Sequence, residues 1–492
     1  MYGVIVPYGP NYRQYFHVKG GNNLSFVPIQ LDSLSNEPLY LQLFSQIKHA
    51  ILSDVLSAGY KLPAIRQLAK ELSVNNVTVI NAYKQLESSG YVTSKKGSGF
   101  YVTKPNTPEI SLMTIPPATL TQNGINFSSA SPHPAIFPTD SFKYCLDEVI
   151  DRDKGFAFGY QEANGFMPLR EVLTEYLVKT HNIHTSPSHI QIVSGAQQGI
   201  DIIAKSCLNS GDYVITETPT YNGATDAFKS RSSRIVTVEL TPLGIDLIEL
   251  EKKVKICKPK LVYVMTKFQN PTTLCYAPST LKQLLYLAHT YNFYLIEDDS
   301  TSELSYIDTE PYSLKALDTQ DRVIYIKSFS KLLMPGLRIG FLVIPNALLD
   351  RFTKIKQMTD IASSGLIHRS LDLFFRTHKW EEHLSYMKAI YSGKYTLMLS
   401  QLENLKKLGV TFTVPNGGLC FWLKLPKTLS ASKLYEDCLQ NGLLILPSTL
   451  FYPTMHKQKD HYIRLSFAPC DAKEIIDGMM ILEKCIKKGL SK

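Results

Sequence analysis

The feature that most constrains the fold is a series of short apolar runs, rich in β-branched residues, that recur between helical stretches from about residue 123 to the carboxyl end. Strands of this composition that alternate with helices form a mainly parallel sheet with helices on both faces. The sequence therefore predicts an α/β body over residues 123–492. Its expected strands are 190–193, 213–215, 234–238, 261–265, 293–296, 323–326 and 340–344.

Composition limits the classes of protein to which the chain can belong. With 492 residues, 44% hydrophobic and 19% charged, it has the composition of an ordinary globular protein of about two to four domains. No run approaches the ~18 to 20 apolar residues of a membrane span, and no amino-terminal secretion signal is found, so we expect a cytoplasmic protein without a membrane partner. The eight cysteines form no Cys-x-x-Cys pair, and we expect neither a metal site nor a disulfide framework.

Residues 38–104 carry a different pattern, in which apolar residues recur at helical spacing and two β-rich pieces follow. The expected elements are helices over 39–56, 65–72 and 77–87 and strands over 91–93 and 99–102. Two short helices joined by a tight turn allow the second to enter a DNA major groove. The segment also holds eight basic and three acidic residues, although a solvated lysine-rich surface would give the same count. We predict a winged helix-turn-helix module that binds double-stranded promoter DNA.

Two further segments flank this module. Residues 105–122 combine four prolines with polar residues, which is typical of a semi-stiff linker. Residues 1–37 form an amino-terminal extension with no clear periodicity, for which we predict neither an element nor a function.

Three turns that follow predicted strands carry residues suited to a planar, phosphorylated ligand. The first is Ser194–Gly199, where small residues open a helix and expose backbone N–H groups to a phosphate. Tyr221 could stack on a planar ring, and Asn270 could donate to a phenolic oxygen. Taken singly, these are equally the features of a plain strand-to-helix turn, a core aromatic residue and a proline turn.

Lys331 and Asp298 point more firmly to pyridoxal phosphate. Lysine forms a reversible imine with an aldehyde, and a buried carboxylate keeps a pyridine nitrogen protonated. Ser328 and Arg338 lie three residues before and seven after the lysine, where they can hold a phosphate. Arg464 could bind the carboxylate of a ligand. Any one of them could be part of a structural ion pair, but their occurrence together favours a cofactor site.

The amino-terminal module resembles the DNA-binding domain of the GntR family, through Lys61–Arg66, Thr78–Val79, Ala82–Tyr83 and the wing at 96–100. The resemblance implies DNA contacts at its basic and helix-starting positions. These are Arg66, Lys95 and Lys96, with Asn75, Asn76 and Thr78 at the start of the recognition helix. The family usually has arginine where Asn76 stands and often asparagine where Val77 stands, so we expect a different operator preference.

The body resembles the fold type I, aspartate-aminotransferase-like superfamily, with large and small subdomains. From residue 36 onward the chain resembles the MocR subfamily of bacterial transcription regulators. The resemblance implies an imine at Lys331, ring contacts from Asp298, Asn270 and Tyr221, a phosphate site at Ala196, Gln197, Ser328 and Arg338, and a carboxylate site at Arg464. It also implies a head-to-tail homodimer in which Tyr160 reaches the phosphate of the neighbouring subunit and each DNA module crosses over its partner.

Two departures from the family pattern bear on function. Ser300 stands where a tyrosine is expected beside the phenolic oxygen, and Thr273 stands where glycine commonly follows the asparagine-proline-threonine turn. We therefore expect cofactor binding more firmly than turnover. The leading hypothesis is a ligand-responsive transcription regulator whose effector is an amine, an amino acid or the cofactor itself. The alternatives are an active aminotransferase with an autoregulatory DNA module, and a dimerisation scaffold that no longer binds the cofactor.

Overall fold

The computed structural model describes residues 14–20, 23–29, 31–32, 38–52, 55–95, 97–103, 124–307, 313–453 and 460–491. The chain divides into two compact units, Met1–Ser111 and Leu112–Lys492. Each unit is a body of its own, and the expected linker at 105–122 lies outside the described residues. The boundaries predicted for the DNA module and the body remain predictions.

The first unit contains the expected winged helix-turn-helix. Its elements are α1 Leu39–Leu52, α2 Ile65–Glu71, α3 Asn76–Ser88, β3 Val92–Lys95 and β4 Gly99–Val102. Strands β3 and β4 form an antiparallel hairpin. The three helices bury one apolar stripe each, and Leu43, Leu68, Val79 and Leu86 are completely enclosed. Helix α1 ends at Leu52, earlier than the periodicity predicted.

The amino-terminal extension contains a hairpin that the sequence did not predict. Strand β1 (Gln14–Gly20) pairs antiparallel with β2 (Asn23–Ile29). Pairing is set by backbone hydrogen bonds, so two strands can form where side chains show no clear alternation. Ile29 is 2% exposed and packs into the core of the DNA module, which ties this segment to the first unit.

Eight strands form the central sheet of the body, in the order β6-β13-β12-β11-β10-β7-β8-β9. Their bounds are β6 Ile190–Val193, β7 Tyr213–Thr218, β8 Arg234–Thr241, β9 Gly244–Ile245, β10 Leu261–Val264, β11 Tyr294–Asp299, β12 Val323–Ser328 and β13 Gly340–Val343. Strands β8, β7, β10, β11 and β12 pair in parallel, whereas β13 is antiparallel to both β12 and β6. The predicted strands are all present, and the sheet is mainly parallel.

Helices cover both faces of this sheet because its strands are apolar on both sides. The bounds of the helices are α4 Thr139–Asp153, α5 Met167–His181, α6 Gly195–Cys207, α7 Asn222–Ser230, α8 Leu247–Cys257, α9 Pro278–Thr290, α10 Leu349–Asp360 and α11 Gly365–Arg376. Successive residues of β7, β10 and β11 point to opposite faces of the sheet and join different apolar clusters. Val214, Leu261 and Ile296 pack with α6, α7 and α10, and Ile215, Val262 and Leu295 pack with α8 and α9.

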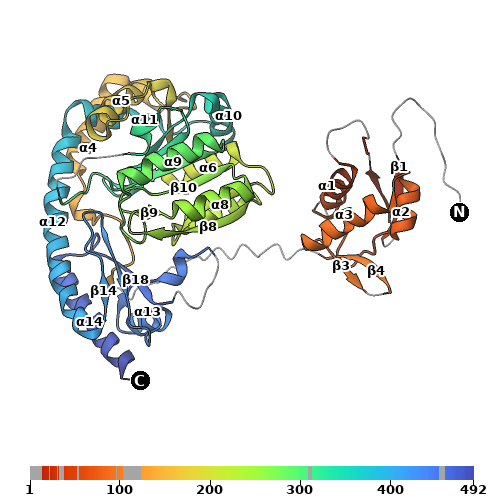
Figure 1. The fold of residues 1–492 in the computed structure, drawn as a ribbon. Coiled ribbons are helices and arrows are strands. Elements are labelled where there is room, and N and C mark those ends of the chain that lie inside the picture. Colours follow the sequence, from red (N-terminus) through yellow and green to blue (C-terminus); the bar gives the residue numbers. More distant parts are fainter. Residues whose placement is uncertain are drawn as a thin grey trace. The chain divides into compact units, whose positions relative to one another are not determined.

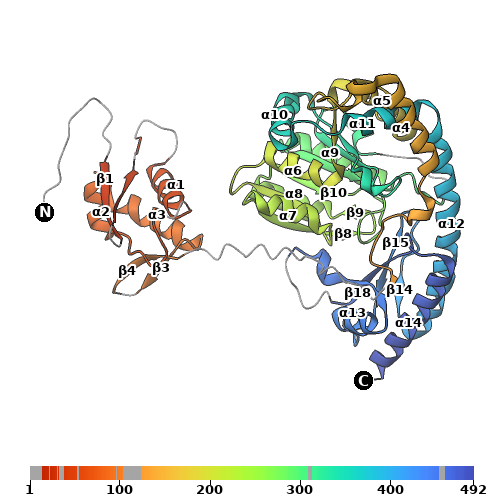
Figure 2. The ribbon, with the colours of Figure 1, turned by 180° about the vertical axis from the view of Figure 1, so that it is seen from behind.

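A smaller subdomain completes the body, as expected. Its sheet has the order β14-β15-β18-β17, with bounds Thr411–Phe412, Cys420–Lys424, Tyr462–Ser466 and Leu446–Pro447. Helices α13 (Ala431–Gln440) and α14 (Ala472–Leu490) pack on it, and the short β16 (Leu443–Leu444) pairs with β5 (Ile125–Asn126). The long α12 (Lys379–Leu405) runs along the large and small subdomains (Figure 1 and Figure 2).

Within the described ranges, no helix has the length and apolar character that crossing a membrane requires. The same ranges contain no group of three or more side chains suited to hold a metal ion.

Candidate functional site

The polar residues singled out in the sequence meet at the carboxyl ends of the parallel strands, where ligands bind in sheets of this kind. Ser194 follows β6, Tyr221 follows β7 and Asn270 lies in the loop after β10. Asp298 is the penultimate residue of β11, and Lys331 lies three residues beyond β12. The structure therefore brings together segments that are far apart in the sequence.

Asp298 is a buried carboxylate with a single hydroxyl donor. It is 8% exposed, and the Tyr263 hydroxyl donates to its Oδ2 at 2.6 Å. Burial raises the pKa of Asp298 to about 6, against the opposing effect of the Tyr263 hydrogen bond, and the charge of Asp299 raises it further. The sequence analysis missed Tyr263. Its signal was a tyrosine inside a wholly buried strand, since a buried phenol needs a hydrogen-bond partner.

Lys331 is a partly buried amine without a carboxylate partner among the described residues. Burial lowers its pKa to about 8, and the guanidinium groups of Arg464 and Arg338 lower it as well, while Cys420 acts in the opposite direction. A larger fraction of Lys331 is therefore neutral near pH 7 than for an exposed lysine, and the neutral amine is the nucleophilic form.

Arg338 lies close to the amino terminus of α6. Its Nη2 donates to the Ser194 carbonyl at 2.8 Å. Gly195 has φ +75°, which favours glycine, and a Cβ there would lie 2.7 Å from Arg338 Nη2, so any other residue would also displace the guanidinium. Beside Arg338 is a cavity of about 230 Å³, which is also lined by Ser194, Asp360 and His368.

Tyr221 is fixed by a short chain of hydrogen bonds. Its hydroxyl donates to Gln197 Oε1 at 3.0 Å, and Gln197 Nε2 donates to the Gly223 carbonyl at 2.9 Å. Burial raises the pKa of Tyr221, as does Asp298, whereas Arg338 opposes the rise. Tyr221 thus lies within electrostatic reach of both the buried carboxylate and the arginine at α6.

Arg464 is a buried cation, and within the described part of the chain its hydrogen bonds go to neutral groups. Its Nη1 donates to Asn270 Oδ1 at 2.8 Å, its Nη2 donates to the Ser128 carbonyl, and its Nε is buried with no partner among those residues. The guanidinium lies 5.3 Å from the centre of the Phe451 ring. A buried guanidinium without a carboxylate partner is costly unless an anion joins it, so this position suits the carboxylate of a ligand.

The remaining predicted phosphate residues belong to the same region. Ala196 and Gln197 lie in the first turn of α6, whose amino terminus favours anions. Ser328 ends β12 and is buried, and its Oγ accepts from the Ser330 N–H at 3.3 Å. The site therefore offers one buried carboxylate, a nucleophilic amine and two guanidinium groups. This set of groups fits a ligand that has an electrophilic carbon, a basic ring nitrogen and a phosphate.

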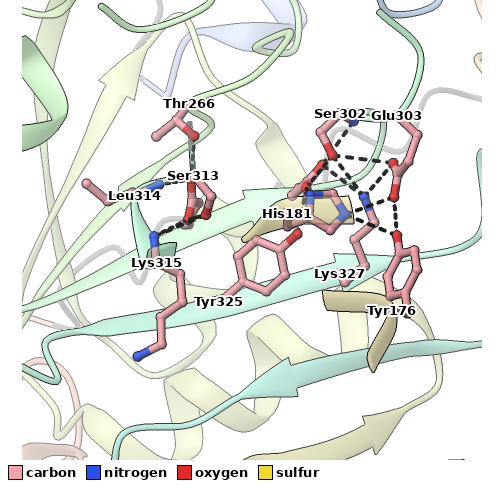
Figure 3. A network of polar contacts seen from close by, with 12 residues as sticks. Tyr176, His181, Thr266, Ser302, Glu303, Ser313, Leu314, Lys315, Tyr325 and Lys327 are labelled. Atoms are coloured by element: carbon pink, nitrogen blue, oxygen red, sulfur yellow. Dashed lines mark hydrogen bonds and ion pairs between the residues drawn. The ribbon is translucent and has the colours of Figure 1, made fainter. Parts of the chain in front are cut away.

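Behind the site lies a fully paired network of buried charges, shown in Figure 3. Lys327 Nζ lies 3.1 Å from Asp299 Oδ1 and 2.7 Å from Glu303 Oε2, and His181 Nε2 lies 3.1 Å from Glu303 Oε1. The Tyr325 hydroxyl donates to Asp299 Oδ2 at 2.6 Å. This network joins α5, β12 and the end of β11, so it fixes the strand that carries Asp298.

Electrostatics distinguish this network from the neighbouring site. Burial alone would lower the pKa of Lys327, but the carboxylates of Asp299 and Glu303 hold it above its usual value. Burial would likewise raise the pKa of Glu303, but Lys327 and His181 hold it well below its usual range. Lys327, Asp299 and Glu303 are therefore all charged at neutral pH, and the positive charge of Lys327 compensates the two carboxylates.

Glu297, one residue before Asp298, holds a further segment at the carboxyl end of β11, and Figure 3 labels Ser313, Leu314 and Lys315 of that segment. It accepts hydrogen bonds from the Ser313 hydroxyl and from the backbone N–H groups of Leu314 and Lys315, each at 2.8 Å. Glu297 and Asp299 thus have structural partners. Of the three acidic residues at the end of β11, Asp298 is the one available to a ligand.

Tyr160 is not part of this site within one chain. Its side chain is 89% exposed, and Phe156, Phe158 and Met167 nearby are also exposed. An exposed aromatic group of this kind is typical of a surface that contacts another protein.

The DNA-binding residues predicted in the first unit lie on its surface. Arg66, Asn76 and Lys95 are exposed and Thr78 is partly buried, while Lys96 lies outside the described residues. Asn75 caps α3, because its Oδ1 accepts from the Val77 N–H at 2.9 Å.

The sequence analysis missed an aromatic partner of the wing. Lys95 Nζ lies 4.9 Å from the centre of the Tyr101 ring, and Lys61 Nζ lies 5.9 Å from it. The two lysines thus converge on one tyrosine of the wing strand β4, an arrangement that sequence spacing alone could not reveal.

Comparison with known proteins finds a matching family model for each of the two units. Residues 137–478 match the family model described as aminotransferase class I and II, and residues 39–102 match bacterial regulatory proteins of the gntR family. Over 481 residues the chain is 30% identical to the uncharacterized HTH-type transcriptional regulator YdfD of Bacillus subtilis, covering 92% of this chain and 98% of that protein.

The body resembles solved structures of aminotransferases, among them the following two. The kynurenine aminotransferase of Pyrococcus horikoshii has a TM-score of 0.71 at 32% identity, covering 75% of this chain and 92% of that one. LysN, the alpha-aminoadipate aminotransferase of Thermus thermophilus, has a TM-score of 0.70 at 30% identity, covering 76% and 94%. The latter is complexed with N-(5'-phosphopyridoxyl)-L-leucine.

The fold and the site thus define a fold type I aminotransferase-like body joined to a winged helix-turn-helix. The chain belongs to the aminotransferase class I and II family, among the HTH-type transcriptional regulators that begin with a gntR-family DNA-binding domain. This membership, with the pyridoxyl-containing neighbours, implies pyridoxal phosphate as the cofactor.

Proposed function

We propose that this regulator holds pyridoxal phosphate through Lys331, responds to a small amine or amino acid, and binds promoter DNA as a homodimer. The observation that carries the proposal is the coexistence, in one chain, of a helix with a solvent-exposed face in the DNA module and a site whose cations Lys331 and Arg464 have no carboxylate partner among the described residues.

Each site residue has a role that follows from its surroundings. The Lys331 amine, whose pKa is lowered to about 8, is the nucleophile that attaches the cofactor. The Asp298 carboxylate holds a proton on the ring nitrogen, and Tyr263 keeps that carboxylate oriented by the 2.6 Å hydrogen bond to Oδ2. When bound, pyridoxal phosphate supplies an aldehyde that links covalently to amines and a ring that withdraws electrons from them.

The phosphate and the effector are assigned to the two arginines. Arg338, Ser328 and the first turn of α6 at Ala196 and Gln197 bind the phosphate by charge-assisted hydrogen bonds. Arg464 binds the carboxylate of an amino-acid effector, and a carboxylate would compensate its buried charge. Asn270, whose Oδ1 accepts from Arg464, would lie near the phenolic oxygen of the ring, and Tyr221, whose pKa is raised by Asp298, would lie over the ring.

The homodimer rests on the exposed group around Tyr160. Phe156, Phe158 and Tyr160 are 83%, 66% and 89% exposed, and burying them against a second copy would remove a large apolar surface from water. In the head-to-tail arrangement expected from the family resemblance, Tyr160 would reach the phosphate of the neighbouring subunit.

The test is DNA retardation by the full chain, with and without added pyridoxal phosphate and a panel of amines and amino acids. The probe is a duplex from the region upstream of the chain's own gene. We expect retardation with a steep salt dependence, and a change in DNA affinity when the effector binds. Failure to retard any duplex at low salt would refute the regulator proposal.

An active aminotransferase is a second candidate, favoured by the intact set of Lys331, Asp298, Arg338 and Arg464. Incubation with an amino donor and a keto-acid acceptor separates the two. Many product molecules per chain indicate an enzyme, whereas at most one per chain indicates a sensor.

A further inference from the structure

The solvent-exposed face of α3 has an unusual order of apolar, amide and charged side chains. Val79, Ala82, Tyr83 and Leu86 are buried in the module, so the opposite side of the helix faces solvent. Val77, Asn81, Lys84 and Ser88 follow one another at intervals of three and four residues and are all exposed, which places them on a single stripe.

The first two turns of this stripe carry an apolar side chain and an amide, but no charge. Val77 is 56% exposed, although a valine gains nothing from contact with water. Asn81 is also exposed, and the cation of the stripe, Lys84, comes only in the next turn. In a helix-turn-helix the amino-terminal residues of the recognition helix contact base edges, and later ones approach the backbone.

These side chains select among the four base pairs by simple chemistry. An asparagine amide pairs in two places with the N6 and N7 edge of adenine, and an apolar group packs on the methyl group of thymine. Guanine is read through its O6 and N7 acceptors, most often by arginine or lysine, and neither occurs on the outward stripe before Lys84. Asn75 has its Oδ1 occupied by the Val77 N–H at 2.9 Å, so it is less able to read a base.

We propose that α3 reads adjacent A·T pairs in each operator half-site, with Val77 packed on a thymine methyl group and Asn81 paired with an adenine edge. This inference rests on the proposed DNA-binding function and deepens it by naming the chemistry of the operator. Lys84, in the following turn, contacts a phosphate and contributes affinity without choosing sequence.

The experiment uses the full chain and a duplex library with a randomised core, followed by retardation assays on the selected sequence. We expect A·T pairs at neighbouring positions of the selected half-site. Replacing the contacted thymine by uracil removes one methyl group, and we expect this to weaken wild-type binding roughly fourfold. The Val77→Ala variant should discriminate less between thymine and uracil duplexes, because it loses most of the side chain that packs on the methyl group.

A matched control separates this effect from general changes in the module. Val55 is 40% exposed in the same unit but lies outside α3, and Val55→Ala should keep the wild-type preference for thymine. Asn81→Ala should lose preference at the adenine position by about tenfold, and Lys84→Ala should weaken all duplexes alike.

The outcomes distinguish the inference from the function on which it rests. Tight binding to selected duplexes with G·C pairs at the contacted positions would overturn the inference alone. Undiminished discrimination between thymine and uracil by Val77→Ala would overturn it as well. If the wild-type chain retards no duplex even at low salt, the DNA-binding function fails, and the reading of A·T pairs fails with it.

Discussion

Two neighbouring regions of the body treat buried charge in opposite ways. In the network behind β11, Lys327, Asp299 and Glu303 compensate one another at distances of 2.7 and 3.1 Å. In the site a few residues away, Lys331 and Arg464 have no carboxylate partner among the described residues, and the charge of Arg464 helps to lower the pKa of Lys331. We infer that the paired network stabilises the fold, whereas the site contains positive charges that a bound anionic ligand would compensate.

The largest expected effect comes from breaking the paired network. Lys327→Met should lower the free energy of unfolding of the body by about 3 to 5 kcal/mol, because it leaves two buried carboxylates without their cation. Lys331→Met is the matched control and should cost little or nothing, since it removes a partly buried cation that lacks a carboxylate partner. Denaturant unfolding followed by circular dichroism measures both. Equal losses in the two variants would contradict the contrast between the regions.

The next effect concerns pH and the adjacent carboxylates of β11. The folded pKa of Asp298 is raised from 3.8 to about 6, so its ionisation costs stability as pH rises through that range, and Asp298→Asn should remove this cost. Without cofactor, the variant should gain on the order of 2 kcal/mol relative to wild type between pH 4 and pH 6.

Asp299→Asn provides the contrasting result. The pKa of Asp299 is lowered by Lys327, against the opposing effect of burial, so its stabilising contribution is present above its unfolded pKa and is lost as pH falls through the folded one. The variant should therefore be less stable than wild type at pH 7, and the two should converge in acid. Parallel pH profiles for the two variants would refute the division of roles along β11.

Removal of the buried guanidinium should change ligand preference more than stability. Arg464→Met should weaken binding of amino-acid effectors about 10- to 100-fold, as expected for the loss of charge-assisted hydrogen bonds in a buried site. Amines without a carboxylate should bind with nearly unchanged affinity, as isothermal titration would show. A similar loss for both ligand classes would place the carboxylate elsewhere.

The smallest effect concerns the backbone beside Asn270. Thr273 has φ +62°, a conformation that disfavours a β-branched residue. Thr273→Gly should relieve this strain, and loss of the Thr273 hydroxyl that donates to the Thr272 carbonyl at 2.6 Å offsets part of the gain, so the free energy of unfolding should rise by less than about 1 kcal/mol. Thr272→Gly is the control and should be destabilising, because it removes the Thr272 hydroxyl that donates to Gln269 Oε1 at 2.6 Å. Destabilisation by both changes would show that Thr273 is not strained.

Much of this structure could be predicted from the sequence, because the spacing of apolar residues along the chain indicates which side of a helix or strand is buried. The strands of the body, the two helices of the helix-turn-helix and both wing strands are present where apolar spacing placed them. The hairpin β1–β2 could not be predicted, because its pairing depends on backbone bonds that leave no clear side-chain pattern.

The site was predicted in part, for a related reason. Some site residues could be singled out because their side-chain type alone suggests a function. These are Lys331, Asp298, Arg338 and Arg464. Tyr263 was missed because its hydroxyl meets Asp298 only through the parallel pairing of β10 with β11. The network of Lys327, Glu303 and His181 was missed for the same reason, since contacts between α5, β11 and β12 appear only in three dimensions. The roles of the site residues remain predictions.

The central claim concerns Lys331, which has no carboxylate partner in the described part of the chain, and Lys327, which is paired with Asp299 and Glu303. We propose that the amine of Lys331, and not that of Lys327, attaches pyridoxal phosphate. The most direct measurement is reduction with borohydride after incubation with the cofactor, followed by peptide mapping by mass spectrometry. We predict one pyridoxyl group per chain on the peptide at Lys331, and none after Lys331→Ala. A protein that gains no pyridoxyl group, or gains it at other lysines while Lys331 stays unmodified, would contradict the account.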